Sequence, residues 1–180
     1  MKKRFIATLL ASALSITMLA GCGTAKEEQT ECFDFTAPEL VSELDEWLID
    51  LTELDAYTFD DATDKVIAYV SNKDVFTTDA DTYYAMMHYD IYCNNETDEV
   101  SSLSFFIDRN SADAASRYLY HISSVAQSID ENVNTETIYD TIVTDSEIDG
   151  LYSGEHFIIR AYNDENYYHA TFIPINKGND

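Results

Sequence analysis

Apolar residues recur every three or four positions in two segments, and this spacing predicts two amphipathic helices. The first, residues 36–51, opens with Thr36 and Glu39 in a T-x-x-E capping box and with Pro38 in the first turn. Its apolar stripe consists of Leu40, Leu44, Trp47, Leu48 and Leu51. Because such a stripe packs on other elements, we expect Trp47 to be a core residue rather than a platform for a ligand.

The second helix is predicted at residues 110–130, with Asn110 or Ser111 as its cap and Asp113 in its first turn. The residues that it should bury are Ala115, Tyr118, Leu119, Ile122, Val125, Ala126 and Ile129. A shorter helical segment is expected at 135–143.

Other segments alternate between two sets of residues, which is typical of strands. In residues 81–94 the set expected in the core is Tyr83, Ala85, Met87, Tyr89, Ile91 and Cys93, and the set on the other face is Tyr84, Met86, His88, Asp90 and Tyr92. After a polar turn, residues 101–109 return with Leu103, Phe105 and Ile107 on one side, which predicts an antiparallel hairpin. Residues 155–163 and 167–175 predict a second hairpin.

Residues 60–72 fit two patterns. Phe59, Thr63, Val66, Ile67 and Val70 suit a short helix, whereas Val66, Ala68 and Val70 alternate as in a strand. We favour the helix.

Helix, hairpin, helix and hairpin in this order predict an α+β two-layer sandwich, with an antiparallel sheet of about four strands and two main helices on one face. A chain of 180 residues suits one domain, and we place it at residues 36–176.

The first residues have the pattern of a signal peptide, over residues 1–21. Lys2, Lys3 and Arg4 precede an apolar run from Phe5 to Leu19 that polar residues interrupt. The run is shorter than the roughly 20 residues that a membrane-spanning helix needs.

Leu19, Ala20, Gly21 and Cys22 resemble the lipobox of bacterial lipoproteins, in which a diacylglycerol is attached to the cysteine thiol and the leader is cut before it. The resemblance implies a lipid on Cys22 that anchors the chain to the cell membrane on its extracytoplasmic side, since two acyl chains suffice for stable anchoring. Residues 22–35 are expected to be a flexible, lipidated tether.

The layout of the rest resembles small Gram-positive lipoproteins of uncharacterised function, including S-A-x-x-A at Ser111 and R-x-Y-N at Arg160. This resemblance implies no activity.

The charge is strongly negative, with 10 Lys and Arg against 34 Asp and Glu, a net charge of −24. A surface of this sign repels phosphate backbones, so we expect no nucleic acid as a partner. It attracts a cationic protein or peptide, and it also keeps an exported domain soluble.

Cys32 and Cys93 are the thiols that remain besides Cys22. In an exported protein they could form a disulfide, and closing that loop would stabilise the fold by about 4 kcal/mol. The alternative is that Cys93 is a small buried residue at a strand end and that Cys32 lies in the tether.

No pattern predicts a metal, a cofactor or a catalytic residue. Residues 145–150 resemble the start of an EF-hand loop, but His156 stands where its last ligand should be a glutamate. His88, His121, His156 and His169 lack the spacing that places two imidazoles on one metal. We therefore expect a protein that is not an enzyme.

The second face of the first hairpin is the expected binding surface, through Tyr84, Met86, His88 and Tyr92. Burial of these side chains under loops is the alternative. The leading hypothesis is a lipid-anchored extracytoplasmic binding protein. The alternatives are a lipid-anchored hydrolase with a site assembled from distant residues, and an acidic inhibitor or immunity lipoprotein.

Overall fold

The computed structural model describes residues 31–58, 64–73, 87–111, 113–144 and 147–175. The helices are α2 (Ala37–Glu46), α3 (Ala114–Ile129) and α4 (Thr135–Ile142). The strands are β1 (Asp50–Thr58), β2 (Asp64–Lys73), β3 (His88–Asn94), β4 (Val100–Asp108), β5 (Val143–Thr144), β6 (Glu147–Ile148), β7 (Gly150–Ser153), β8 (Phe157–Asn163) and β9 (Tyr167–Pro174).

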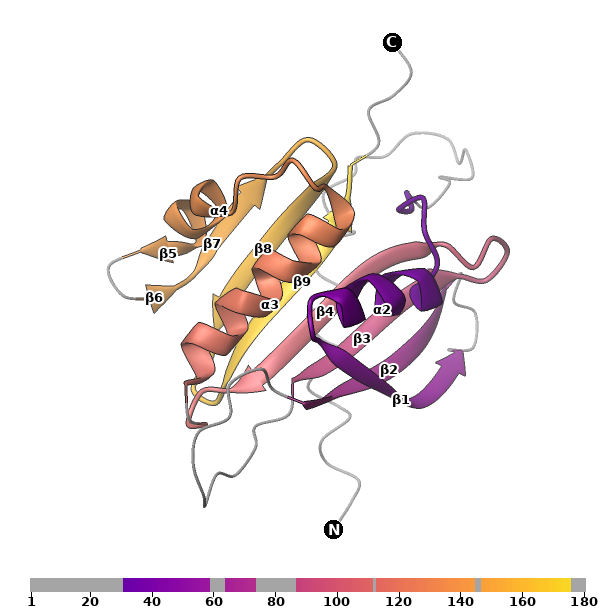
Figure 1. Ribbon diagram of the computed structural model, residues 1–180, viewed down its shortest axis with the longest axis horizontal. Helices are drawn as coiled ribbons and strands as arrows, with labels where there is room; N and C mark the ends of the chain where they lie inside the picture. The colour runs from indigo at the N-terminus through magenta and orange to yellow at the C-terminus, as the bar shows by residue number, and fades with distance from the viewer. Residues whose placement is uncertain (1–30, 59–63, 74–86, 112, 145–146, 176–180) are drawn as a thin grey trace, which may run out of the picture.

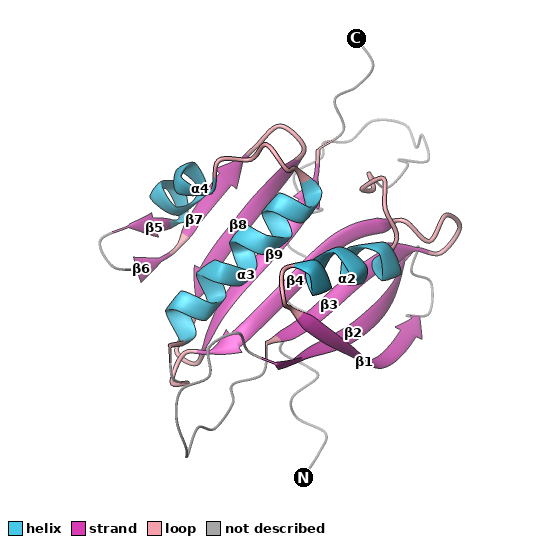
Figure 2. Ribbon diagram, in the orientation of Figure 1, coloured by secondary structure: helices cyan, strands magenta, loops and turns pink. Residues whose placement is uncertain are grey.

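One seven-stranded antiparallel sheet, in the order β1-β2-β3-β4-β9-β8-β7, organises the fold. Helices α2 and α3 lie across one face of it, and α4 lies beside β7 (Figures 1 and 2). Strands β5 and β6 pair separately. The α+β class and both predicted hairpins are confirmed. The sheet is wider than the predicted four strands because β1 and β7 were not predicted and a helix was favoured where β2 lies.

Helix α2 begins as predicted and ends earlier. The Thr36 N–H donates to Glu39 Oε2 over 2.8 Å, so the capping box is present. The predicted end at residue 51 is wrong, because Leu48 has a φ of 61° and Ile49 N–H donates to the Leu44 carbonyl. This is the Schellman motif, in which a left-handed residue ends the helix. The chain then enters β1, and Leu48 is 65% exposed.

The helix favoured for residues 60–72 is wrong over its described part, which is strand β2. Ile67 pairs with Ile91 of β3 and with Ala56 of β1, so β2 has a neighbour on each side. Apolar residues occur on both faces of this strand, and Val66 and Tyr69 are both buried. A strand that buries both faces does not alternate cleanly, which explains the ambiguity of its sequence.

Helix α3 starts later than predicted. Its cap is Asp113, with a left-handed φ of 56°. Asn110 and Ser111 do not cap the helix. The Asn110 N–H and the Ser111 hydroxyl donate to Asp108, so both shape the turn that leaves β4.

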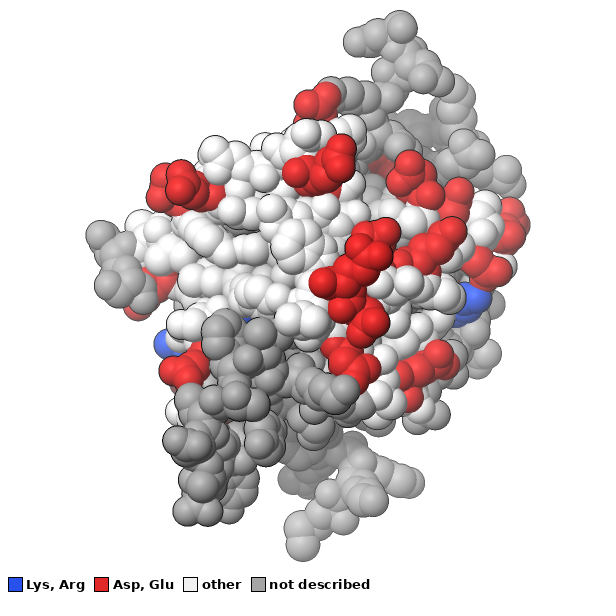
Figure 3. Space-filling view, viewed as in Figure 1, with Lys and Arg blue, Asp and Glu red and all other residues white. Residues whose placement is uncertain are grey.

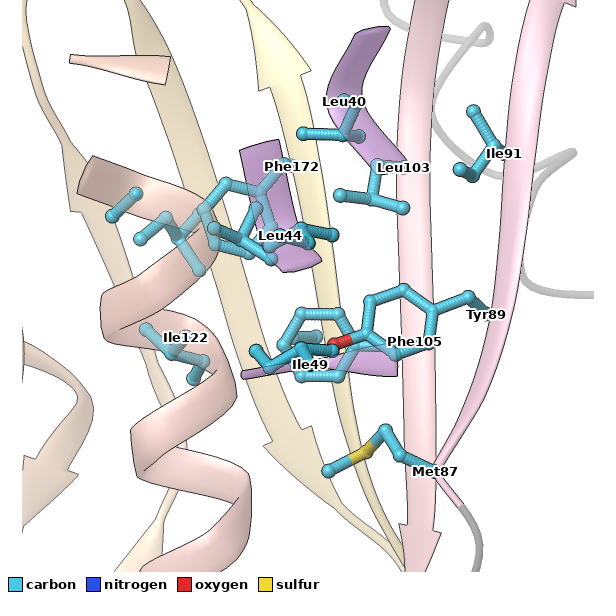
Figure 4. Packing of buried hydrophobic residues seen from close by; sticks show 14 of the residues in the cluster. Leu40, Leu44, Ile49, Met87, Tyr89, Ile91, Leu103, Phe105, Ile122 and Phe172 are labelled. Carbon is cyan, nitrogen blue, oxygen red and sulfur yellow. The ribbon is translucent and has the colours of Figure 1, made fainter. Parts of the chain in front are cut away.

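The core lies between the helices and the sheet (Figure 4). Its members from β3, β4 and β9 are alternate residues, among them Tyr89, Ile91, Leu103, Phe105, Ile107 and Phe172. Helix α4 adds Ile138 and Ile142 to the same cluster. Trp47 packs against this cluster and is half-buried, as a core role predicts.

The domain begins earlier than residue 36. Phe33 is 5% exposed and belongs to the core, and its N–H donates to the Val100 carbonyl over 2.8 Å. The predicted tether, which ran to residue 35, therefore extends too far. The predicted signal peptide and Cys22 lie outside the described residues. Among the described helices, none is long and apolar enough to cross a membrane.

Candidate binding surface on the outer face of the sheet

The sheet face turned away from α2 and α3, which we call the outer face, carries the residues that alternate with the core positions. In β3 the buried residues Tyr89, Ile91 and Cys93 alternate with half-buried His88, Asp90 and Tyr92. Strands β4, β8 and β9 follow the same alternation. The outer-face residues used below are His88, Asp90, Tyr92, Ser104, Phe106, Arg160, Tyr162, His169 and Thr171.

Four rings form a row across four strands of the outer face, which we call the aromatic row. His88 is opposite Phe106, Phe106 is opposite His169, and Tyr162 is opposite His169. The His88 and Phe106 rings stack with centroids 4.9 Å apart and planes within 9°. The Tyr162 and His169 rings stack at 4.6 Å and 8°. Cross-strand aromatic pairs of this kind fix the strand register.

Stacking determines which part of each ring a partner can reach. Phe106 has His88 stacked against it, lies 6.0 Å from His169, and meets Tyr167 in an edge contact at 5.5 Å. Both faces of Phe106 are therefore turned to neighbouring rings of the row. What Phe106 offers a partner is its ring edge.

A second row on the outer face, displaced by two residues along each strand, is polar. Asp90 is opposite Ser104, Ser104 is opposite Thr171, and Thr171 is opposite Arg160. The Ser104 and Thr171 hydroxyls hydrogen-bond over 3.0 Å. The Arg160 guanidinium lies 5.7 Å from the Tyr162 ring centroid. The row thus carries a carboxylate at β3 and a cation at β8.

Burial changes the charge state at the β3 end of both rows. It raises the pKa of the Asp90 carboxyl and lowers the pKa of the His88 imidazole. Burial thus favours the neutral imidazole of His88 and disfavours the charged form of Asp90.

The turn between β8 and β9 holds His169 in place. Asp164 Oδ1 accepts the N–H groups of Asn166 and Tyr167, and Oδ2 lies 3.0 Å from His169 Nε2. Burial raises the pKa of Asp164, but these hydrogen bonds together outweigh it and lower the pKa overall. His169 is therefore clamped between this carboxylate and the Tyr162 ring.

Two of the four predicted surface residues, His88 and Tyr92, lie on the outer face as expected. Tyr84 and Met86 lie outside the described residues. Sequence reasoning missed the partners from β4, β8 and β9, namely Phe106, Tyr162 and His169. Phe106 alternates with the predicted core residues Phe105 and Ile107, so its place on the outer face could have been inferred. No core face was predicted for the second hairpin, and the strand register that brings the three residues together could not be read from the sequence.

The two domain cysteines are thiols in the structure. Cys93 is buried at the end of β3, and burial raises its pKa. Cys32 is half-buried near Glu99 and Asp64, and burial followed by these charges raises its pKa. Cys93 thus fits the alternative of a small buried residue, while the disulfide stays a prediction for the exported protein.

The histidines outside the row have other environments. His121 is buried, and its Nδ1 hydrogen-bonds with the Tyr89 hydroxyl. His156 is exposed and lies 4.0 Å from Asp130 Oδ2. Within the described ranges no three His, Cys, Asp or Glu residues gather as metal ligands. Glu147 of the EF-hand-like segment lies in β6, and Asp145 and Ser146 lie outside the described residues.

Acidic residues gather on the opposite side of the molecule, over α2 and the strands beside it, whereas the surface over α3 is largely uncharged (Figure 3). Exposed Glu39, Glu43, Asp45 and Glu46 belong to α2. The attraction of cations is therefore not confined to the outer face, which carries the aromatic and polar rows.

Comparison with known proteins gives no relative. No protein-family model, no curated protein and no solved structure matches the chain.

Proposed function

We propose that this chain is a lipoprotein, anchored through Cys22 on the extracytoplasmic side of the cell membrane, whose acidic domain binds a cationic protein or peptide on its outer face. The aromatic row is the observation that carries the binding role. Ordered rings on a sheet face offer a partner apolar area at little entropic cost.

The anchor rests on the lipobox-like residues before Cys22. Replacing this cysteine by serine removes the thiol that takes the lipid, so Cys22→Ser should release the protein from the membrane fraction and leave its leader uncut. Retention of the variant in membranes with a normally shortened chain would contradict the anchor.

The cationic nature of the partner rests on charge. A chain with a net charge of −24 attracts basic surfaces at low salt, and the attraction weakens as salt screens it. Asp90 places one such charge directly beside the aromatic row.

Binding of a basic peptide, lysine and leucine alternating, to the protein purified in detergent micelles tests the role of the outer face. Phe106→Ala removes the central ring of the row, and Leu48→Ala removes an exposed apolar side chain elsewhere as the matched control. We expect Phe106→Ala to weaken binding at low salt about tenfold. The substitution removes apolar contact area and also the ring against which His88 and His169 pack.

Leu48→Ala should bind like the unchanged protein. Equal affinity of all three proteins, or a loss only when Glu43 of α2 is changed to Lys, would show that the outer face is not the binding surface.

A further inference from the structure

From the polar row we infer that Asp90 is the anion of a subsite for a lysine side chain of the partner, with the alkyl stem along the β3 end of the aromatic row and the ammonium at the carboxylate. This inference rests on the proposed function, because it names the group that the outer face selects.

The environment of Asp90 suits the binding of a cation. Tyr89 and Ile91, its neighbours along β3, point into the core, so the carboxylate stands on the outer face. It is half-buried, and within the described part of the chain it has no hydrogen bond or ion pair. A half-buried carboxylate without a cation is costly, and an incoming ammonium would relieve that cost.

The stem has to pass the rings of the aromatic row, because the β2 side of Asp90 is closed. Ala68 of β2 is opposite Asp90, with Val66 and Val70 two residues away on either side of it in the same strand. These valines are only 1% and 5% exposed, so they offer the stem no contact area. His88, two residues before Asp90, is half-buried, is kept neutral by burial and stacks on Phe106. Lysine buries its methylene groups on apolar surface while its charged end stays at a polar group.

Ring geometry favours lysine over arginine. A guanidinium gains from stacking on an aromatic face, but the faces of His88 and Phe106 are stacked on each other. For Phe106, with His88 on one side and His169 on the other, only the ring edge remains, and the edge carries the positive side of the ring quadrupole. A compact ammonium that reaches past the edges to Asp90 avoids this region.

Arg160 disfavours binding of a cation at the opposite end of the polar row. It stands at the β8 end of the polar row, three strands from Asp90, or about 14 Å at a spacing of about 4.8 Å per strand. Its charge repels a second cation there. The lysine is therefore directed to β3, and the Ser104 and Thr171 hydroxyls between the two charges face the polar groups of the partner's backbone.

The test compares Asp90→Asn, which keeps the shape and removes the charge, with Glu43→Gln on α2 as the matched control of equal charge change. The protein in detergent micelles is titrated with capped tetralysine and with capped tetra-arginine at low salt. We expect Asp90→Asn to bind tetralysine about tenfold more weakly and Glu43→Gln to change affinity less than twofold, with tetra-arginine binding more weakly than tetralysine.

Unchanged tetralysine affinity in Asp90→Asn overturns the inference, and so does an equal loss in both variants, which would show general attraction only. Tighter binding of tetra-arginine overturns the preference for lysine. Thermal unfolding of Asp90→Asn checks that the fold is retained, and Asp90→Glu, which restores the charge, should recover part of the affinity. If Phe106→Ala weakens binding while Asp90→Asn does not, the outer face remains the binding surface and only the lysine subsite falls.

Discussion

His121 is a titratable group placed where it cannot easily take up a proton. It is 4% exposed, its Nδ1 meets the Tyr89 hydroxyl, and its ring lies among the rings of Tyr89, Phe105 and Tyr120. Burial first, and then the nearby charge of Arg117, lowers its pKa from 6.5 to about 3. The imidazole is therefore neutral in the folded protein throughout the physiological range.

This burial makes stability depend on pH. The unfolded chain takes up a proton at His121 near pH 6.5, while the folded chain does so only near pH 3, so acid favours unfolding between these values. His121 should thus contribute full stability above pH 6.5 and lose about 2 kcal/mol of it between pH 7 and pH 5.

Urea unfolding at both pH values measures this loss. In His121→Gln, which cannot titrate, the dependence should flatten, whereas the exposed control His156→Gln should keep it. Identical pH dependence in the unchanged protein and His121→Gln would contradict the account.

At the scale of residues, alternation predicted well which side chains face inward. Met87, Tyr89, Ile91 and Cys93 are buried as expected, and so are the core positions of the following strand. What alternation could not reveal is which residues meet across strands. The stack of His88 on Phe106 depends on a register that brings together positions 18 residues apart, and the stack of Tyr162 on His169 depends on a second one.

At the scale of elements, the end of α2 was missed because no residue in its sequence marks it. Leu48 occupies the left-handed position after the helix, where glycine is preferred because it has no Cβ. Since Leu48 and Leu51 continue the apolar spacing of Leu44, nothing in the pattern marks the end of the helix. The motif itself is intact, with Leu48 N–H donating to Asp45 and buried Ile49 placed beside buried Leu44.

Leu48→Gly should therefore stabilise the protein. A non-glycine residue in this conformation costs about 1 kcal/mol, and the exposed Leu48 side chain offers little packing in return. We expect the free energy of unfolding in urea to rise by about 0.5–1 kcal/mol, while Leu48→Ala, which keeps a Cβ, stays near the unchanged protein. A loss of stability in Leu48→Gly would mean that the leucine side chain makes contacts that matter.

The other element-scale error, β2, has a different origin. Its identity comes from its neighbours, because hydrogen bonds to β1 and β3 on both edges outweigh a weak local preference. Helices α3 and α4 and the second hairpin were predictable because each carries a clear period and a polar boundary.

At the scale of the whole molecule, the sheet separates two surfaces with different properties. One side carries the helices, the core beneath them and the acidic residues of α2, and the other carries the aromatic and polar rows. The α+β class followed from the order of elements, but the sheet width and the cross-strand rows arise only when β3, β4, β9 and β8 lie side by side. The proposed anchor at Cys22 would hold both surfaces outside the cytoplasm.

The four histidines allow one direct test of the claim that the outer face binds basic partners, because together they report on three different places. His88 and His169 lie in the aromatic row, His121 lies in the core, and His156 is exposed beside Asp130. NMR of the histidine-labelled protein in detergent micelles, titrated with the alternating lysine and leucine peptide, follows all four imidazoles at once. The account predicts that the signals of His88 and His169 shift together and saturate while those of His121 and His156 stay in place. Saturable binding that leaves His88 and His169 unmoved, or that moves His156 alone, would contradict it.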